Sequence, residues 1–175
     1  MSSEKNNEFK AINISVLTIS DSRTIEQDDS GEYLVSALEE QGHVLSDRKI
    51  CKDNLYEIIA IISQWILDDN VHGIITTGGT GITGKDGTPE AILPLLDKTI
   101  DGFGEMFRSL SYQNIKTSTL QSRAFAGVAN GTFIFCLPGS PGACKDGWNL
   151  LIKDQLDSRT KPCNLVELMP RLNEQ

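Results

Sequence analysis

Short β-branched apolar runs alternate with longer amphipathic stretches through the first half of the chain, and few folds accommodate that alternation. The runs at 11–20, 43–53 and 71–77 have the composition of buried strands. The stretches at 30–41 and 54–69 carry apolar residues at helical spacing. Strands that alternate with helices are typical of βαβ units. The sequence therefore predicts an α/β fold built on a mostly parallel sheet.

Residues that favour helix ends mark where these helices begin and end. Asp29 begins a capping-box pattern, and Gly42 is typical of a C-terminal stop. Asn54 is predicted to cap the second helix. Thr88 and Pro89 predict a further helix start, with a hydroxyl cap followed by proline at the first helical position.

The second half of the chain contains a helical stretch, a hairpin and a final helix. Residues 104–113 have a helical pattern. Two apolar runs flank Asn130 and Gly131, which is a strong hairpin signal. Residues 140–156 predict a helix entered from a turn rich in proline and glycine, and the polar tail from residue 157 onward predicts a surface arm.

The size and composition indicate one compact domain. The chain has 175 residues, of which 39% are hydrophobic and 23% charged. Such a chain buries a sizeable core without disulfides. We expect a polar N-terminal tail at 1–10, a single domain at 11–165 and a C-terminal tail at 166–175.

The charge balance argues against a nucleic-acid or membrane partner. The net charge is −8 and the pI is about 4.7, whereas duplex binding usually depends on a basic patch. No apolar run reaches the length of a membrane span, and the first ten residues lack the apolar segment of a secretory signal. A local pocket for a small anion remains compatible with this charge. Its candidate basic residues are Arg23, Lys85, Arg123 and Lys145.

Cysteine and histidine usage predicts a cytoplasmic protein without a structural zinc site. Four cysteines occur without a CxxC pair, at Cys51, Cys136, Cys144 and Cys163. This usage is typical of reduced thiols in the cytosol. His43 and His72 form no ligand pattern with the cysteines, and both are predicted to be structural.

Ligands bind α/β sheets at the carboxyl ends of the strands, so the turns that follow the predicted strands are the candidate site. These turns are "SDSR" at 20–23, "KDN" at 52–54 and "LPGSPG" at 137–142. The third predicted strand is followed by a glycine run that holds Gly78, Gly79, Gly81, Gly84 and Gly87.

Two known phosphate motifs fit the glycine run poorly. Gly79, Gly81 and Gly84 match G-x-G-x-x-G, but that motif opens a helix within the glycines and here the helix begins near Thr88. The run also matches a P-loop as far as the lysine, but Asp86 stands where the P-loop has a hydroxyl residue for magnesium.

The remaining interpretation is an extended loop whose main-chain N–H groups face an anion. Glycines permit positive φ and close ligand approach, and the helix that follows adds its N-terminal dipole. Asp86 would then hold Mg²⁺, which bridges the carboxylate to bound phosphates. A glycine-rich turn that binds nothing is the structural alternative.

The run "TTGGTGITGKD" resembles the signature of the MoaB/Mog family of molybdenum cofactor biosynthesis proteins, both in its glycines and in the spacing to Asp86. Five further segments resemble the MoaB branch, and the resemblance covers residues 12–165. These segments are "DDSGEYL", "DGFGEMFR", "STLQSRAFAGV", "FCLPGSPGACKDGW" and "QLDSRTKPCN".

The resemblance implies a three-layer α/β sandwich with helices on both faces of the sheet. It implies that the protein binds molybdopterin and transfers AMP to its terminal phosphate from Mg-ATP, with release of pyrophosphate. ATP and molybdopterin are then substrates and Mg²⁺ is the cofactor. It also implies a homo-oligomer, either a trimer or a hexamer, and a place among other molybdenum cofactor biosynthesis proteins.

The family pattern assigns roles to residues of this chain. Asp86 and Asp53 match the two catalytic aspartates, and Asp86 would hold the magnesium ion. The phosphate site would be lined by Gly78, Gly79, Thr80, Gly81 and Gly84. The nucleotide would meet Ser20, Asp21 and Ser22. The pterin side would be formed by Ser122, Arg123, Pro138, Gly139 and Ser140, in a turn that reaches residue 142.

Structural alternatives stay open for parts of this site. Asp53 fits a turn before Asn54 as well as a catalytic role, and 138–142 fits a turn and helix cap. Gly87 stands where Mog-type sequences have a β-branched residue, which would loosen Asp86. A non-catalytic carrier that binds molybdopterin or a nucleotide is therefore the second hypothesis, and a nucleoside triphosphatase is a weaker third.

Overall fold

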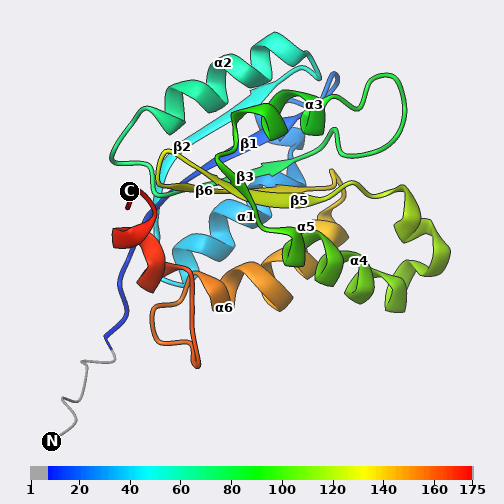
Figure 1. Ribbon diagram of the computed structural model, residues 1–175. Coiled ribbons are helices and arrows are strands. Elements are labelled where there is room, and N and C mark those ends of the chain that lie inside the picture. Colours follow the sequence, from blue (N-terminus) through cyan, green and yellow to red (C-terminus); the bar gives the residue numbers. More distant parts are fainter. Residues whose placement is uncertain (1–7, 175) are drawn as a thin grey trace, which may run out of the picture.

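The computed structural model describes residues 8–174 and is organised around one mixed sheet (Figure 1). The strands are β1 (Asn13–Ile19), β2 (Val44–Cys51), β3 (Gly73–Thr77), β4 (Lys98–Thr99), β5 (Phe125–Ala129) and β6 (Thr132–Leu137). Their order is β2-β1-β3-β6-β5-β4. The pairs among β2, β1, β3 and β6 are parallel, whereas β5 runs antiparallel to both β6 and β4. The predicted mostly parallel sheet is confirmed.

Helices cover both faces of this sheet. They are α1 (Asp29–Glu40), α2 (Leu55–Ile66), α3 (Thr88–Ile92), α4 (Asp101–Ile115), α5 (Pro141–Gly147) and α6 (Lys153–Gln155). A π-helical turn, Trp148–Ile152, joins α5 to α6. In Figure 1, α2 and α3 lie above the sheet and α1, α4 and α6 lie below it. This arrangement is the α/β three-layer sandwich that the resemblance implies.

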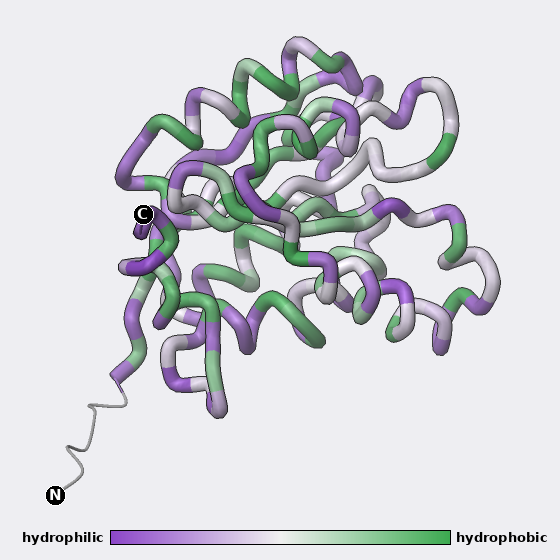
Figure 2. Tube along the Cα trace, viewed as in Figure 1, coloured by the Kyte–Doolittle hydropathy of each residue, from purple (hydrophilic) through white to green (hydrophobic). Residues whose placement is uncertain are grey.

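Two apolar clusters hold the layers together, one on each face. Ile58 and Ile62 of α2 pack with Ile92 of α3 in the smaller cluster. Phe103 of α4 and Trp148 belong to the larger one. Each of these side chains is at most 7% exposed, so burial of apolar area is the main stabilising contribution at both interfaces. The helices alternate between apolar and hydrophilic residues along the chain, as expected for helices with one buried face (Figure 2).

The predicted turn and cap signals are partly confirmed. Asn130 and Gly131 both have positive φ, at 46° and 81°, and they join β5 to β6 as a hairpin. Asn54 caps α2 by accepting from the main-chain N–H groups of Tyr56 and Glu57.

Two predicted caps are wrong. Asp28, not Asp29, caps α1, because its carboxylate accepts from the N–H of Gly31. Thr88 is the first residue of α3 rather than its cap. Its hydroxyl donates instead to the carbonyl of Gly78 at 2.9 Å, so it holds the glycine run against the helix.

The surface arm predicted from residue 157 onward packs against the domain instead. Ser158, Asn164 and Val166 are each at most 7% exposed. A 3-10 helix at Val166–Arg171 follows, and Val166 belongs to the larger apolar cluster. Leu165, Met169 and Leu172 also pack against that cluster, and hydrogen bonds from Ser158 and Asn164 hold the segment in place.

Most of the predicted N-terminal tail lies outside the described residues, which begin at 8. Phe9 lies with its ring centroid 5.0 Å from that of His43. Burial lowers the pKa of His43 to about 4, and its Nδ1 accepts from the N–H of Ile12. His43 is therefore a buried neutral side chain, as predicted. No helix within residues 8–174 is long and apolar enough to cross a membrane.

Candidate functional site

Three turns at the carboxyl edge of the sheet are tied together by hydrogen bonds. The main-chain N–H of Asp53, after β2, donates to Asp21 Oδ1, after β1, at 3.1 Å. The N–H of Gly87, after β3, donates to Asp53 Oδ1 at 3.0 Å. Lys85 Nζ lies 3.2 Å from Asp21 Oδ2. The turns that follow β1, β2 and β3 therefore form one unit, as the parallel topology predicts.

The glycine run takes backbone conformations that other residues rarely adopt. Gly78 has φ 110° and Gly79 has φ 67°. A Cβ at Gly78 would lie 2.1 Å from the carbonyl oxygen of Ile19, so β1 and β3 approach each other more closely than a side chain permits. The structure thus requires glycine at both positions.

Two carboxylates occupy the space that side chains on the glycine run would fill. A Cβ at Gly79 would lie 2.8 Å from Asp53 Oδ2, and one at Gly81 would lie 2.6 Å from Asp86 Oδ2. Asp53 and Asp86 therefore converge on neighbouring parts of the same loop. Gly84 has no heavy atom within 4 Å of its Cβ position, so nothing in the protein requires glycine there.

Asp86 is held by its own loop. Its Oδ2 accepts from the main-chain N–H of Thr83 at 2.8 Å and from the Thr83 hydroxyl at 2.7 Å. Burial acts to raise the pKa of Asp86, but hydrogen bonds from Thr83 and the positive charge of Arg123 hold the pKa below its ordinary value. Asp86 is therefore a carboxylate in a fixed orientation at neutral pH.

The pKa of Asp53 is shifted in the opposite direction from that of Asp86. Burial raises the pKa of Asp53, and the hydrogen bond from Gly87 opposes that rise. The negative charges of Asp86 and Asp21 raise the pKa further, since two carboxylates at one site disfavour each other's ionised form. A bound cation would relieve this repulsion.

The loop also presents main-chain donors. Within residues 8–174, the N–H groups of Gly79, Thr80 and Ile82 donate no hydrogen bond. By contrast, the N–H of Gly78 pairs with Leu137 of β6 at 3.0 Å. Gly79 and Thr80 are adjacent, and adjacent N–H groups without a partner are what an anion cradle offers.

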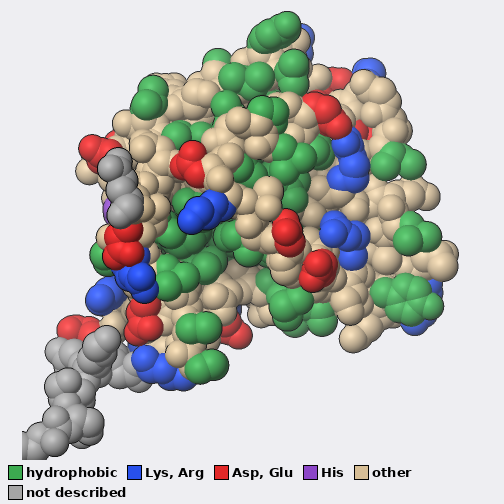
Figure 3. Space-filling view, in the orientation of Figure 1, with side chains coloured by type: hydrophobic (Ala, Val, Ile, Leu, Met, Phe, Trp, Pro, Cys, Tyr) green, Lys and Arg blue, Asp and Glu red, His purple; other side chains and the backbone are tan. Residues whose placement is uncertain are grey.

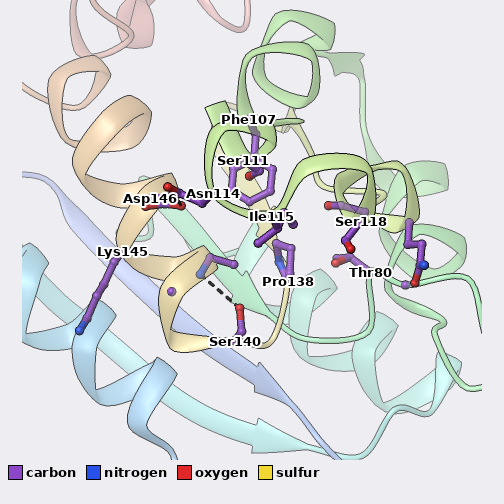
Figure 4. Close-up of a pocket in the computed structure, with 15 residues that line it drawn as sticks. Thr80, Phe107, Ser111, Asn114, Ile115, Ser118, Pro138, Ser140, Lys145 and Asp146 are labelled. Atoms are coloured by element: carbon purple, nitrogen blue, oxygen red, sulfur yellow. Dashed lines mark hydrogen bonds between the residues drawn. The ribbon is translucent and has the colours of Figure 1, made fainter. Parts of the chain in front are cut away.

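A cavity of about 450 Å³ lies between the glycine run, α4 and the turn after β6 (Figure 4). Its wall is mostly apolar, with Phe107 and Ile115 of α4 facing Pro138. Polar groups stand at its edges. The members of the predicted site that line it are Thr80, Gly81, Ser122, Pro138 and Ser140. A partly apolar cleft with a few polar groups is typical of a site for a ring-bearing ligand.

A second hollow of about 400 Å³ lies along the later part of the loop. It is lined by Ile82, Thr83, Gly84, Asp86, Gly87, Glu90 and Arg123. Asp86 and Arg123 thus face this hollow, whereas Ser122 faces the larger cavity. Different parts of the glycine run thus line the two spaces.

Two residues from early in the sequence donate hydrogen bonds to the turn after β6. Arg23 Nη1 donates to the carbonyl of Gly139 at 3.0 Å, and the Ser30 hydroxyl donates to the same oxygen at 2.9 Å. Ser140 caps α5 by accepting from the N–H of Ala143, as the cap interpretation predicts. The polar members of this turn thus have structural roles.

Of the three residues predicted in the turn after β1, only Asp21 contacts the turns after β2 and β3. Asp21 touches Asp53 and Lys85, as described above. Ser20 uses its hydroxyl oxygen within its own turn, where it accepts from the N–H groups of Ser22 and Arg23. Ser22 is exposed.

The four basic residues predicted for an anion pocket do not gather at one place. Arg23 pairs with Gly139, Lys85 with Asp21 and Arg123 with Glu90. Lys145 extends away from the other labelled side chains of the cavity, and its Nζ lies 5.7 Å from the ring centroid of Tyr33 (Figure 4). Any anion site here depends on main-chain donors more than on these side chains.

Comparison with known proteins decides the family. A family profile described as "Probable molybdopterin binding domain" matches residues 15–158. The chain is 51% identical over 162 residues to molybdenum cofactor biosynthesis protein B of Escherichia coli strain K12, covering 93% of this chain and 95% of that protein. The chain belongs to the MoaB/Mog family.

Solved structures of this family have the same fold. A crystal structure of molybdenum cofactor biosynthesis protein B superposes with a TM-score of 0.85 at 38% identity, covering 95% of this chain and 98% of that one. A tungsten cofactor synthesizing protein MoaB from Pyrococcus furiosus gives a TM-score of 0.75 at 34% identity, covering 83% and 92%. The resemblance that the sequence shows is confirmed.

The donor set at the glycine run of this MoaB/Mog chain fits a magnesium ion that also binds substrate phosphates. No group of three or more His, Cys, Asp and Glu side chains between residues 8 and 174 could hold a metal ion alone. Mg²⁺ is usually held by one or two carboxylates together with phosphate and water oxygens. Asp53 and Asp86 are such a pair, and each has one oxygen that Gly87 or Thr83 does not occupy.

Sequence reasoning on the MoaB/Mog pattern missed several residues of this site. Thr83 orients Asp86, and Glu90 pairs with Arg123. Phe107 and Ile115 form the apolar wall of the cavity. The spacing Thr83-x-x-Asp86 was a detectable turn signal. The others gave no local signal, because α4 reaches the site only through the tertiary fold.

Proposed function

We propose that the protein acts in molybdenum cofactor biosynthesis, where it binds molybdopterin and transfers AMP to its terminal phosphate from Mg-ATP. One observation carries the proposal. Asp53 and Asp86 converge on a glycine loop that has unpaired main-chain donors and a cavity beside it. The names of the relatives support the pathway and the family profile supports the pterin ligand.

The proposed reaction is a phosphoryl substitution. An oxygen of the molybdopterin terminal phosphate forms a bond to the α-phosphorus of ATP. The bond from that phosphorus to the α,β-bridging oxygen breaks, and pyrophosphate leaves with that oxygen. The attacking phosphate is already anionic, so no protein base has to remove a proton. Catalysis then depends on positioning and on neutralising charge.

The loop and the cavity beside it would supply both the positioning and the charge neutralisation. The N–H groups of Gly79, Thr80 and Ile82 would bind phosphoryl oxygens, and the cavity walled by Phe107 and Ile115 would hold the pterin ring. Asp86, with Asp53 beside it, would hold Mg²⁺, which neutralises phosphate charge when bound.

A direct assay tests the proposal. Purified protein is mixed with molybdopterin, Mg²⁺ and ATP labelled at the α-phosphate, and the products are separated by chromatography. We expect labelled AMP-molybdopterin that requires both molybdopterin and Mg²⁺. Product formation at the level of a protein-free blank would end the claim.

A second candidate is a non-catalytic carrier of molybdopterin or a nucleotide. The observation that favours it is the double hydrogen bond from Thr83 to Asp86, because a carboxylate used in this way also has a purely structural explanation. Isothermal titration with molybdopterin separates the two. A carrier binds molybdopterin with the same affinity whether or not Mg-ATP is present, and it forms no product.

We propose further that the protein is a cytoplasmic homo-oligomer, either a trimer or a hexamer, that works with other molybdenum cofactor biosynthesis proteins. All four cysteines are free thiols, as is usual in a reducing compartment. Met106, Tyr112 and Ile115 of α4, together with Leu150, are apolar or aromatic side chains at least 50% exposed. Sedimentation velocity measures the oligomeric state, and a monomer would contradict the proposal.

A further inference from the structure

Arg123 binds the glycine loop at three main-chain carbonyls. Its main-chain N–H donates to Thr80 at 2.9 Å. In the side chain, Nε donates to the carbonyl of Gly81 at 2.7 Å and Nη2 donates to that of Asp86 at 2.8 Å. The guanidinium thus connects the beginning of the loop to its end.

The other side of the guanidinium faces α3. Nη1 and Nη2 both donate to the carboxylate of Glu90, one to each oxygen. All three nitrogen atoms of the side chain therefore have a protein partner, and Glu90 neutralises the charge. A residue arranged in this way is poorly placed to receive a substrate anion, because binding one would break contacts that already exist.

The loop between these anchors has few other restraints. Residues 82–85 are exposed, and the unit from Thr80 to Gly87 contains no regular helix or strand. The hydrogen bonds between Thr83 and Asp86 are internal to the loop, so they shape it without attaching it to the domain. The attachments to the domain come from Arg123, from Asp53 and from the ion pair of Lys85 with Asp21, whose lysine is 82% exposed.

We infer that Arg123 is a positioning residue that holds Asp86 at the reaction site, instead of the pterin contact that the family pattern suggests. The inference rests on the proposed role of Asp86. A planar fork with several donors is needed to reach two carbonyls and a carboxylate at once, and lysine, a single point donor, does not replace it. Figure 3 shows acidic and basic side chains interspersed on the face over α3 and α4.

Amide hydrogen exchange on the ligand-free protein tests the geometry without any activity. The N–H groups of Asp86, Gly87 and Thr88 are hydrogen-bonded within or to the loop, and they serve as probes. In Arg123→Lys and Arg123→Gln we expect these amides to exchange at least about tenfold faster, with α2 and β1 unchanged. Arg171→Lys is the matched control, since Arg171 pairs with Glu174 far from the loop in sequence and should leave the probes unchanged.

Steady-state kinetics then separate positioning from substrate contact. If Arg123 positions Asp86, Arg123→Lys lowers kcat by about tenfold or more and weakens the apparent Mg²⁺ affinity, while the KM for molybdopterin stays within about twofold. If Arg123 contacts the pterin, the KM for molybdopterin rises and kcat changes little.

Each outcome decides the inference. Unchanged exchange at the three probes in both Arg123 variants would overturn it, as would a loss confined to molybdopterin affinity. Faster exchange together with a kcat effect supports it. If the wild-type protein forms no AMP-molybdopterin, the proposed function fails, and the exchange experiment still reports whether Arg123 holds the loop.

Discussion

Two glycine-rich turns follow neighbouring parallel strands, yet they differ in backbone conformation and in surroundings. The loop after β3 has glycines with positive φ and carboxylates where side chains would be. In the turn after β6, Gly139 and Gly142 have ordinary φ, and the nearest atom to a Cβ on Gly139 lies 3.4 Å away. Ser140 caps a helix there, and the turn serves as a cavity wall. Glycine content alone therefore does not identify a reactive loop.

The difference between the turns lies in what takes the place of the missing side chains. At Gly79 and Gly81 the carboxylates of Asp53 and Asp86 occupy that space. At Gly142 nothing lies within 4 Å. The first loop thus collects negative charge beside unpaired N–H groups, which is a suitable environment for a cation with phosphates.

The largest expected effect comes from removing charge from the first loop. Asp86→Asn keeps the size and most of the hydrogen bonding but removes the carboxylate, so we expect the rate of AMP-molybdopterin formation to fall by about 100-fold or more. Ser140→Ala in the second turn should cost about 1 kcal/mol of stability through the lost cap and lower the rate by less than about tenfold. Initial rates with labelled ATP measure both. Equal losses in the two variants would remove the functional distinction between the turns.

The next largest effect is a loss of stability when a side chain is added at Gly78. Gly78→Ala places a Cβ 2.1 Å from the carbonyl of Ile19 at a positive φ, so we expect the free energy of unfolding to fall by about 3 kcal/mol. Gly142→Ala has open space and lies within α5, where alanine should be neutral or stabilise by about 0.5 kcal/mol. Urea unfolding followed by circular dichroism gives both values. A tolerated alanine at Gly78 would show that β1 and β3 separate easily.

The loss of reaction rate at acid pH should follow the protonation of Asp53 and Asp86. The pKa of Asp53 is raised and that of Asp86 is lowered, so on acidification Asp53 takes up a proton first. If the ionised form is needed, the rate falls as the pH falls through the pKa of Asp53, by about tenfold per pH unit below it. The pH profile of Asp53→Asn should start from a lower rate and lack this acid limb. An acid limb that persists in Asp53→Asn would assign the proton to another group.

Much of the fold could be predicted because its signals are local. The alternation of strand and helix patterns predicts the mostly parallel sheet, and Asn130 with Gly131 predicts the hairpin. The packing of the segment after residue 157 was not predicted, since its buried residues include Ser158 and Asn164, whose type usually indicates exposure. The apolar residues Leu165, Val166, Met169 and Leu172, which also pack there, gave a local signal that the prediction of a polar arm passed over.

The candidate site was predictable only in part, for a related reason. The glycines and Asp86 lie within one short run of the sequence, so a sequence pattern can identify them. The contacts of Arg123 with Gly81, Asp86 and Glu90 join segments more than thirty residues apart. Nothing in the local sequence of Arg123 distinguishes an arginine that braces a loop from one that binds substrate. Side-chain geometry is what separates these roles.

The smallest expected effect gives the sharpest test, because it compares two glycines of the same loop. Gly79→Val would not separate a loss of stability from a loss of ligand binding. Its Cβ would lie 2.3 Å from Thr88 Oγ1, at a positive φ that valine rarely adopts. Gly81 and Gly84 both lack positive φ, but a Cβ on Gly81 meets Asp86 Oδ2 at 2.6 Å, whereas one on Gly84 meets nothing.

We therefore expect Gly84→Ala to change stability by less than about 0.5 kcal/mol and to leave the rate near that of the wild type. Gly81→Ala should displace the carboxylate of Asp86 and lower the rate at similar stability. Thermal unfolding and initial rates on the two variants, measured side by side, provide the comparison. A matching loss in Gly84→Ala would mean that the ligand, and not Asp86, needs the space above the loop, because the protein itself places no atom near that Cβ.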